Sequence, residues 1–308
     1  MSTAKQHELD STIRNDLVKR IQKLSTPLEP QPPDVAHDLR KLEGIEAVVL
    51  DVYGTMFISG TGDISLADEG DSSEAIIEAL TAVGFDIKPH ETTAVLADLY
   101  DETVKAFMNE RKSEGIDFPE VNIVAIWEDV LSGLMEKGLL EGDLNDTTIR
   151  QFSVEYECRS NPIWPMPDLE ETLNAIHDEQ YALGIVSNSQ FYTPLMFDAM
   201  LASSVDELGF SENLSVWSYQ ELIGKPSLML YEVLHDRVKS KETFELENIL
   251  YVGNDMLKDI YPADKLGFRT ALFAGDERSY KTRSDDARCK NVKPDVTITE
   301  LKQLLACI

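Results

Sequence analysis

The sequence predicts an α/β protein in which a parallel sheet is interrupted by an inserted block of helices. The apolar run Ala47–Leu50 has no polar alternation, which is typical of a strand covered by helices on both faces. Residues 72–160 show helical spacing with almost no strand signal. From residue 161 onward, strands alternate with helices of about ten to fifteen residues, a pattern that indicates right-handed crossovers between parallel strands.

Residues 1–44 are predicted to form an arm outside the core. A helical pattern near His7–Leu24 is followed by the proline-rich linker PLEPQPPDV and by a short helical pattern near Ala36–Leu42. The prolines exclude a continuous helix and favour extended chain. Three roles are open for the arm: packing on the core, forming a homodimer, or remaining partly mobile. A homodimer is expected through either this arm or the cap.

The α/β core is predicted over residues 45–60 and 161–308, with a helical cap domain, residues 61–160, inserted between them. The cap helices have apolar residues at helical spacing, and Ser72 or Ser73 is a suitable N-cap for the first. They are expected at 72–85, 91–115, 120–140 and 144–160. The cap and the polar loop 60–71 should close over the site and set its specificity.

The second part of the core begins after the linker NPIWPMPD. Strands are predicted at 182–189, 214–218, 248–255, 269–274 and 295–298. Helices are predicted at 168–179, 193–202, 227–238 and 260–266, with a final helix up to residue 308.

The charge of the chain limits its partners. It has 28 basic and 56 acidic residues, a formal charge of −28, which repels nucleic acids and anionic membrane surfaces. A small anionic substrate is compatible with this charge if a metal ion or a buried lysine reverses it locally.

No stretch approaches the roughly 20 apolar residues that cross a bilayer, and no signal-peptide pattern is seen, so a cytoplasmic protein is expected. Cys158, Cys289 and Cys307 have no metal-ligand spacing, which fits a reducing compartment.

Polar residues follow several of the predicted strands at the edge where ligands bind in open α/β sheets. They are Asp51 after the first strand, Ser187 and Asn188 after LGIV, Lys225 after Gly224, and Asp255 and Asp259 after YVGN. Each is weak evidence alone, because polar residues belong in loops. Together, in a parallel sheet, they predict one site.

These segments resemble, in order, the motifs of the haloacid dehalogenase (HAD) superfamily of hydrolases over nearly the whole chain from residue 45. The matching segments are LDVYGTMF, VSN, the lysine of GKP, and YVGNDMLKD. The resemblance implies a Rossmann-like core with a cap inserted after the first motif. It also implies Asp51 as covalent nucleophile, with Ser187 and Lys225 binding the substrate anion beside Thr55 and Asn188. The metal ligands it implies are Asp51, the Tyr53 carbonyl, Asp255 and Asp259.

The charges of these residues support such a site independently. Asp51, Asp255 and Asp259 would place carboxylates together in one crevice, which is costly without cations. Lys225 supplies one positive charge, and a hard divalent ion with oxygen ligands, Mg²⁺, would supply the rest. A carboxylate nucleophile divides hydrolysis into attack and release. We therefore expect magnesium-dependent hydrolysis of a small phosphorylated metabolite.

Tyr53 departs from the phosphatase pattern of the family. Phosphatases carry an aspartate at this position to protonate the leaving group, a contribution of about 10²–10⁴ in rate. The DxYGT pattern is instead similar to that of 2-haloacid dehalogenases, which release halide unprotonated and need no metal. Against this alternative, no arginine occurs between Arg40 and Arg111 to hold a substrate carboxylate, and Asp255 would repel that carboxylate in the absence of a metal. A non-catalytic binding or regulatory protein is a third alternative.

Overall fold

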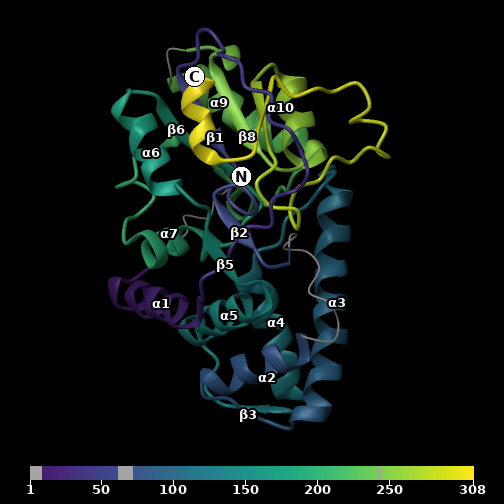
Figure 1. Cartoon of the computed structure of the whole chain (residues 1–308). Helices are drawn as coiled ribbons and strands as arrows, with labels where there is room; N and C mark the ends of the chain where they lie inside the picture. Colours follow the sequence, from purple (N-terminus) through teal and green to yellow (C-terminus); the bar gives the residue numbers. More distant parts are fainter. Residues whose placement is uncertain (1–8, 62–71, 242–243) are drawn as a thin grey trace.

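A computed structural model of the chain describes residues 9–61, 72–241 and 244–308 (Figure 1). Its centre is a six-stranded sheet in the order β10-β9-β8-β1-β6-β7, in which every neighbouring pair is parallel. The strands are β1 (Ala47–Leu50), β6 (Ala182–Ser187), β7 (Phe210–Trp217), β8 (Ile249–Gly253), β9 (Arg269–Phe273) and β10 (Val296–Ile298). The predicted α/β fold class is confirmed.

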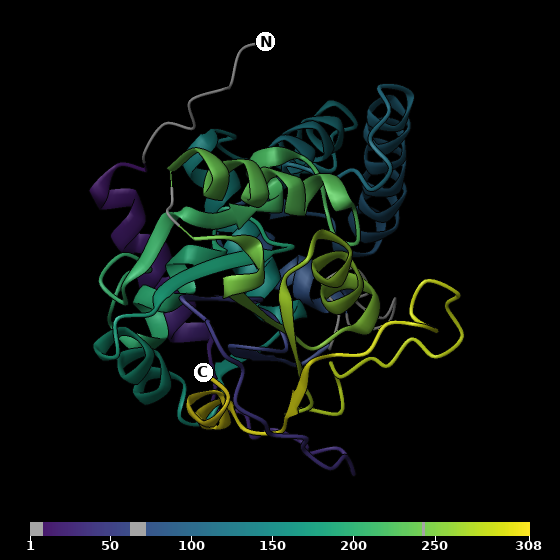
Figure 2. The same ribbon diagram turned by 90° about the horizontal axis from the view of Figure 1, so that it is seen from above.

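Strand β1 lies between β6 and β8 and is buried on both faces. Successive side chains of a strand point to opposite faces. Val48 and Leu50 accordingly pack into one apolar cluster, while Ala47 and Val49 pack into another that includes helix α9 (Leu228–Lys241). Figure 2, the view from above, shows helices on both sides of the sheet. The strand therefore lacks polar alternation because both of its faces are buried in apolar clusters.

The other core helices follow the strands in sequence. They are α6 (Leu169–Asp178), α7 (Thr193–Leu201), α8 (Ser218–Glu221) and α10 (Tyr261–Leu266). Three short helical segments complete the core: the 3₁₀ helices η1 (Leu246–Asn248) and η3 (Leu301–Ala306), and the π-helix η2 (Met256–Ile260). The final helix predicted up to residue 308 is thus a short 3₁₀ helix.

Between β1 and β6 the chain forms a block of four long helices within its described part. They are α2 (Ser72–Ala82), α3 (Pro89–Ser113), α4 (Ile123–Glu136) and α5 (Asp146–Ser160). Two antiparallel pairs were not predicted: β2 (Phe57–Ser59) with β5 (Ile163–Pro165), and β3 (Asp86–Ile87) with β4 (Leu140–Glu141). Strands of two or three residues are too short to show an alternating pattern. The β2–β5 pair places the two connections to the block side by side.

The N-terminal helix α1 (Ser11–Leu24) links this block to the core. It packs against α5 and α7, with Leu17 and Ile21 fully buried. Arg14 forms an ion pair of 2.7 Å with Asp198 of α7, and Arg20 forms one of 2.6 Å with Glu155 of α5. The part of the predicted helix before residue 9 lies outside the described residues.

The prediction of a short helix near Ala36–Leu42 is wrong, because this segment forms no helix and runs as extended chain. Asp38 forms an antiparallel bridge with Thr297 of β10, and the Leu42 amide donates to the Cys307 carbonyl at 2.8 Å. Backbone groups that would form hydrogen bonds within a helix are thus hydrogen-bonded to β10 and to the C-terminal segment instead. No helix in the described part of the chain has both the length and the apolar character needed to span a bilayer.

Replacing Leu17 by alanine should lower the free energy of unfolding by about 2–5 kcal/mol, because the cavity would open between α1, α5 and α7. Urea unfolding of the full chain measures this change. The control is Lys23→Ala on the exposed side of the same helix, which should change stability by less than about 0.5 kcal/mol. Equal midpoints for the two variants would contradict the packing of α1.

Candidate active site

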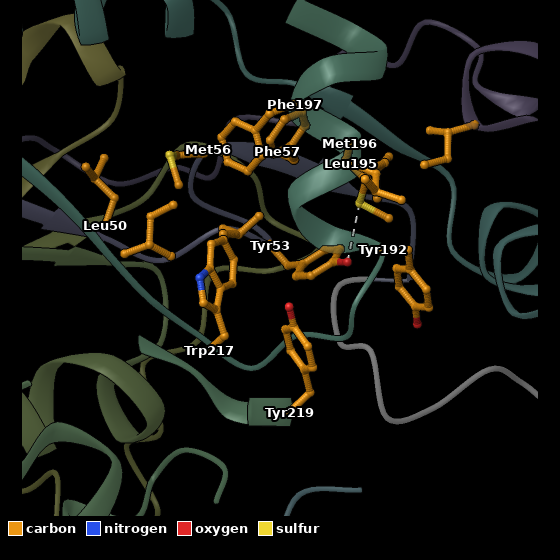
Figure 3. Close-up of a cluster of buried hydrophobic side chains, with 14 of the residues drawn as sticks. Leu50, Tyr53, Met56, Phe57, Tyr192, Leu195, Met196, Phe197, Trp217 and Tyr219 are labelled. Carbon is orange, nitrogen blue, oxygen red and sulfur yellow. Dashed lines mark hydrogen bonds between the residues drawn. The ribbon is translucent and has the colours of Figure 1, made fainter. Parts of the chain in front are cut away.

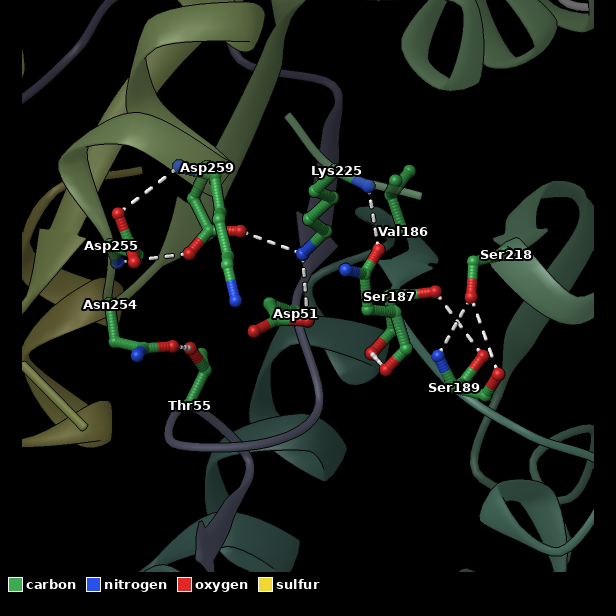
Figure 4. A network of polar contacts seen from close by, with 12 residues as sticks. Asp51, Thr55, Val186, Ser187, Ser189, Ser218, Lys225, Asn254, Asp255 and Asp259 are labelled. Carbon is green, nitrogen blue, oxygen red and sulfur yellow. Dashed lines mark hydrogen bonds and ion pairs between the residues drawn. The ribbon is translucent and has the colours of Figure 1, made fainter. Parts of the chain in front are cut away.

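Three charged side chains meet at the carboxyl end of β1. The Lys225 ammonium lies 2.7 Å from Oδ1 of Asp51 and 2.6 Å from Oδ1 of Asp259 (Figure 4). Asp51 directly follows β1, Lys225 follows α8, and Asp259 lies in η2. The sheet therefore brings together residues that are more than 200 positions apart in the chain.

The Lys225 side chain is only 2% exposed, so it forms these pairs away from water. Burial lowers the pKa of Lys225, but the carboxylates of Asp259 and Asp51 outweigh it and raise the pKa above its ordinary value. Burial raises the pKa of Asp259, and the Lys225 charge offsets part of this shift. The lysine is thus a fixed positive charge beside Asp51.

Asp259 is held mainly by core groups. Its Oδ1 accepts a hydrogen bond from the Tyr251 hydroxyl at 3.2 Å, and its Oδ2 accepts one from the Asp255 amide at 2.9 Å. By contrast, Oδ2 of Asp51 has no hydrogen bond or ion pair with any described residue. Asp259 therefore orients Lys225, while Asp51 has one oxygen without a partner among the described residues.

Ser187 and Asn188 lie on the other side of Lys225 at the end of β6. The Asn188 side-chain oxygen accepts a hydrogen bond from the Lys225 amide at 2.7 Å. The Ser187 hydroxyl is fully buried and donates to the Asn188 carbonyl at 3.1 Å. Asn188 thus ties together two loops predicted to bind the substrate.

Tyr53 is buried among apolar and aromatic side chains, as Figure 3 shows. Its hydroxyl shares a hydrogen bond of 3.0 Å with Thr193 and lies 3.4 Å from the Met196 sulfur. Burial and the nearby Glu157 carboxylate raise the pKa of Tyr53 well above its ordinary value. The phenol therefore stays protonated, but its hydroxyl is engaged with α7.

Thr55 and Asn254 connect the end of β1 to the end of β8. The Thr55 hydroxyl donates to the Asn254 side-chain oxygen at 3.0 Å, and the Asn254 amide donates to the Ser279 carbonyl at 2.7 Å. Gly54 has φ +82°, and a Cβ there would lie 2.5 Å from that of Ser279. Only glycine fits this position without strain. The Thr55 hydroxyl, predicted to bind substrate, thus has a partner within the protein.

Asp255 points away from Asp51 toward the loop between β9 and β10. Its carboxylate accepts hydrogen bonds from the Leu257 and Lys258 amides at the start of η2. It also forms a bidentate pair with Arg283, at 2.6 Å from Nη2 and 3.0 Å from Nε. Sequence reasoning missed Arg283, which lies in a polar loop with no motif around it. The charge of Asp255 is therefore balanced by a guanidinium.

The predicted magnesium ligands do not fit a metal ion in this arrangement. Asp255 is occupied by Arg283, and Asp259 by Lys225. The residue at the end of β8 that faces Thr55 is Asn254, a neutral amide. Across the described ranges, no group of three or more His, Cys, Asp or Glu side chains could hold a metal. The lid loop predicted at 60–71 lies largely outside the described residues.

No family model and no curated protein matches the chain. The solved structures similar to it include a 2-haloacid dehalogenase from Pseudomonas syringae pv. Tomato DC3000, with 19% identity over 85% of this chain and 96% of that one, and a TM-score of 0.50. A predicted phosphoglycolate phosphatase from Haemophilus somnus 129PT has 16% identity over 86% and 98%, and a TM-score of 0.45. A HAD-hydrolase from Bacillus subtilis bound to magnesium has 15% identity over 85% and 97%, and a TM-score of 0.44. The chain therefore shares its fold with a 2-haloacid dehalogenase, as the motifs led us to expect.

Proposed function

We propose that the protein is a hydrolase in which Asp51 attacks the substrate and forms a covalent ester. The observation that carries this proposal is the position of Asp51: one oxygen is paired with buried Lys225, and the other has no partner among the described residues. A carboxylate held in this way is oriented for attack. Water then attacks the ester carbonyl, and the Asp51 carboxylate is regenerated as the product leaves.

Lys225, Ser187 and Asn188 are the groups available to bind an anionic substrate. Ser187 and Asn188 lie at the end of β6, and Lys225, whose amide binds Asn188, lies in the loop after α8 beside Asp51. Fixed donors of this kind stabilise negative charge that develops in a transition state. We propose that the helical block, residues 61–160, covers this site and that its residues select the substrate.

The geometry favours a leaving group that departs unprotonated. The Tyr53 hydroxyl is bound to Thr193 and Met196, so residue 53 is not poised as a strong acid. Arg283 also removes the objection that Asp255 would repel a substrate carboxylate in the absence of a metal. In the favoured reaction, Asp51 Oδ2 bonds to the carbon of a small halogenated acid, and the carbon–halogen bond breaks with its electron pair leaving on halide.

Magnesium-dependent hydrolysis of a small phosphorylated metabolite is the second candidate. It is favoured by the lack of a guanidinium for the substrate carboxylate in the early cap, since Arg111, the first arginine there, pairs with Glu114. This candidate requires Arg283 to leave Asp255. The two reactions therefore differ in a measurable property, their dependence on metal.

The test is a hydrolysis screen of the purified protein against 2-haloacids and phosphate esters, each with magnesium and with chelator. Halide release that persists with chelator and is lost in Asp51→Asn would support the favoured reaction. Magnesium-dependent phosphate release would support the second candidate. If neither product forms, the result supports the alternative of a binding or regulatory protein.

Replacing Arg283 by glutamine should strengthen the binding of Mg²⁺ beside Asp255. The variant leaves Asp255 without its guanidinium partner, and a carboxylate near Asp51 attracts a hard divalent cation. Calorimetric titration with MgCl₂ should show binding at least about tenfold tighter than in the natural chain. The control is Arg288→Gln, which removes a similar pair with Asp286 in the same loop. Equal binding by all three proteins would argue against our interpretation of Arg283.

A further inference from the structure

A segment between α3 and α4 reaches from the helical block to the loop that carries Lys225. The Gly224 amide donates to the Phe118 carbonyl at 2.7 Å, and the Glu120 amide donates to the Leu222 carbonyl at 3.1 Å. Between them, Pro119 and Ile223 form an antiparallel bridge. The block is thus fastened to the core immediately before the active-site lysine.

The Glu120 side chain extends this contact to the loop that follows β6. Its Oε2 accepts a hydrogen bond from the Ser218 hydroxyl at 3.0 Å, and Ser218 Oγ accepts the Ser189 amide at 2.8 Å. Figure 4 shows Ser218 beside Ser189 at the edge of the site. Glu120 Oε1 accepts from the Gln190 side chain at 3.3 Å. One carboxylate therefore supports both residues that directly follow Asn188.

Gln190 strengthens the same connection and carries it toward Tyr53. Its side chain donates to the Val121 carbonyl at 2.9 Å and accepts from the Ile123 amide at 3.1 Å. Its own amide donates to Thr193, whose hydroxyl binds Tyr53. The hydrogen bonds thus run from the helical block, through the β6 loop, to the residue two positions after Asp51.

Glu120 has no cation within ion-pair distance among the described residues. Burial raises the pKa of Glu120 to about 7, although the Val121 amide, the Ser218 hydroxyl and the more distant charge of Lys258 lower it. The Oε2 atom also lies 3.7 Å from where a Cβ on Gly224 would stand, and both side-chain polar atoms of Asn188 lie 3.5 Å from that point. Glu120 is only partly exposed, and its carboxylate is held beside the substrate loops by hydrogen bonds from the Val121 amide, the Gln190 side chain and the Ser218 hydroxyl.

We propose that Glu120 is a positioning residue: it orders the loop Ser187–Gln190 when the helical block is closed, so that Ser187 and Asn188 are aligned to bind the substrate. This inference rests on the proposed function for its kinetic consequence. The ordering of the loop does not depend on which reaction occurs. Substrate affinity should therefore depend on a residue from the helical block that need not touch the substrate.

The experiment compares Glu120→Ala and Glu120→Gln with the natural chain, using 2-chloropropionate and p-nitrophenyl phosphate as kinetic probes. Hydrogen exchange of peptides covering residues 187–193 is measured on the same samples. Glu128→Ala is the matched control, because Glu128 is an exposed acid on α4. The glutamine variant keeps the side-chain shape and one accepting oxygen, so it tests the role even where the alanine variant is unstable.

We expect Glu120→Ala to raise KM by about tenfold with little change in kcat, and to speed exchange of the 187–193 amides by a similar factor. Glu120→Gln should be intermediate, and Glu128→Ala should match the natural chain. Unchanged exchange in Glu120→Ala, or faster exchange with unchanged KM, would overturn the proposal. If neither probe is turned over, the proposed function is in question, while exchange still decides whether Glu120 orders the loop.

Discussion

Replacing Asp51 by asparagine is expected to reduce turnover by at least about a thousandfold, with the fold retained. The side-chain amide has nearly the same shape as the carboxylate but is a far weaker nucleophile, so the covalent ester cannot form at a useful rate. Steady-state turnover on the substrate found in the screen measures the loss. Circular dichroism of the variant checks that the fold is intact.

The covalent intermediate itself gives a more direct test of Asp51. Rapid quenching of the natural protein during turnover, followed by mass spectrometry, should show a substrate adduct on the peptide that contains Asp51. Asp255→Asn is a matched control, because it removes a neighbouring carboxylate that pairs with Arg283 instead of contacting Asp51. This control should form the adduct under the favoured reaction. An adduct in the Asp51→Asn protein, or undiminished turnover, would remove the nucleophile assignment.

The core of the fold and the location of the site could be predicted from local patterns. Ala47–Leu50 is apolar without alternation because its two faces pack into separate apolar clusters. Asp51 directly follows β1, Ser187 is the last residue of the neighbouring strand β6, and parallel strands end at the same edge of a sheet. A pattern that reflects burial and strand direction is therefore enough to bring these residues together.

The features that the sequence did not reveal depend on contacts between distant segments. Arg283 meets Asp255 through a loop without regular structure, and no spacing rule connects the two. The helix predicted at 120–140 begins only at Ile123, because the segment at Phe118–Glu120 pairs with Leu222–Gly224. The extended segment 36–42 likewise depends on the edge of β10. Tertiary contacts override local propensity in each of these segments.

The division into arm, core and cap, and the homodimer, stay predictions. The packing of α1 against both α5 and α7 gives the arm a role within a single chain. Burial of Leu17 and Ile21 in that packing leaves their apolar surface unavailable to a second copy. The exposed side of the helical block is therefore the better place to look for a dimer contact, by light scattering across a concentration series.

Replacing Lys225 by methionine should abolish turnover and also lower the free energy of unfolding by about 3–5 kcal/mol. Methionine has a similar length but no charge, so Asp51 and Asp259 would face each other without their shared cation. Removing one partner of a buried ion pair leaves an uncompensated charge, and this is the source of the cost. Urea unfolding of the full chain measures the stability change.

The loss of stability in Lys225→Met should depend on pH in a defined direction. The pKa of Asp259 is already raised by burial, and losing the lysine charge raises it further. Between the ordinary value and this raised pKa, the folded state binds more protons than the unfolded state, so stability falls as pH rises. The free energy of unfolding that the variant loses relative to the natural chain should therefore be smaller at pH 5 than at pH 8.

The double variant Lys225→Met with Asp259→Asn separates charge from packing. The asparagine removes one of the two uncompensated carboxylates. Its single side-chain oxygen can still accept from the Asp255 amide, and its NH₂ group then faces the Tyr251 hydroxyl oxygen, to which it can donate. We expect it to recover much of the lost stability at pH 8 without recovering turnover, because Asp51 still lacks its cation. If the second substitution deepened the loss, Lys225 would stabilise the fold mainly through the packing of its side chain.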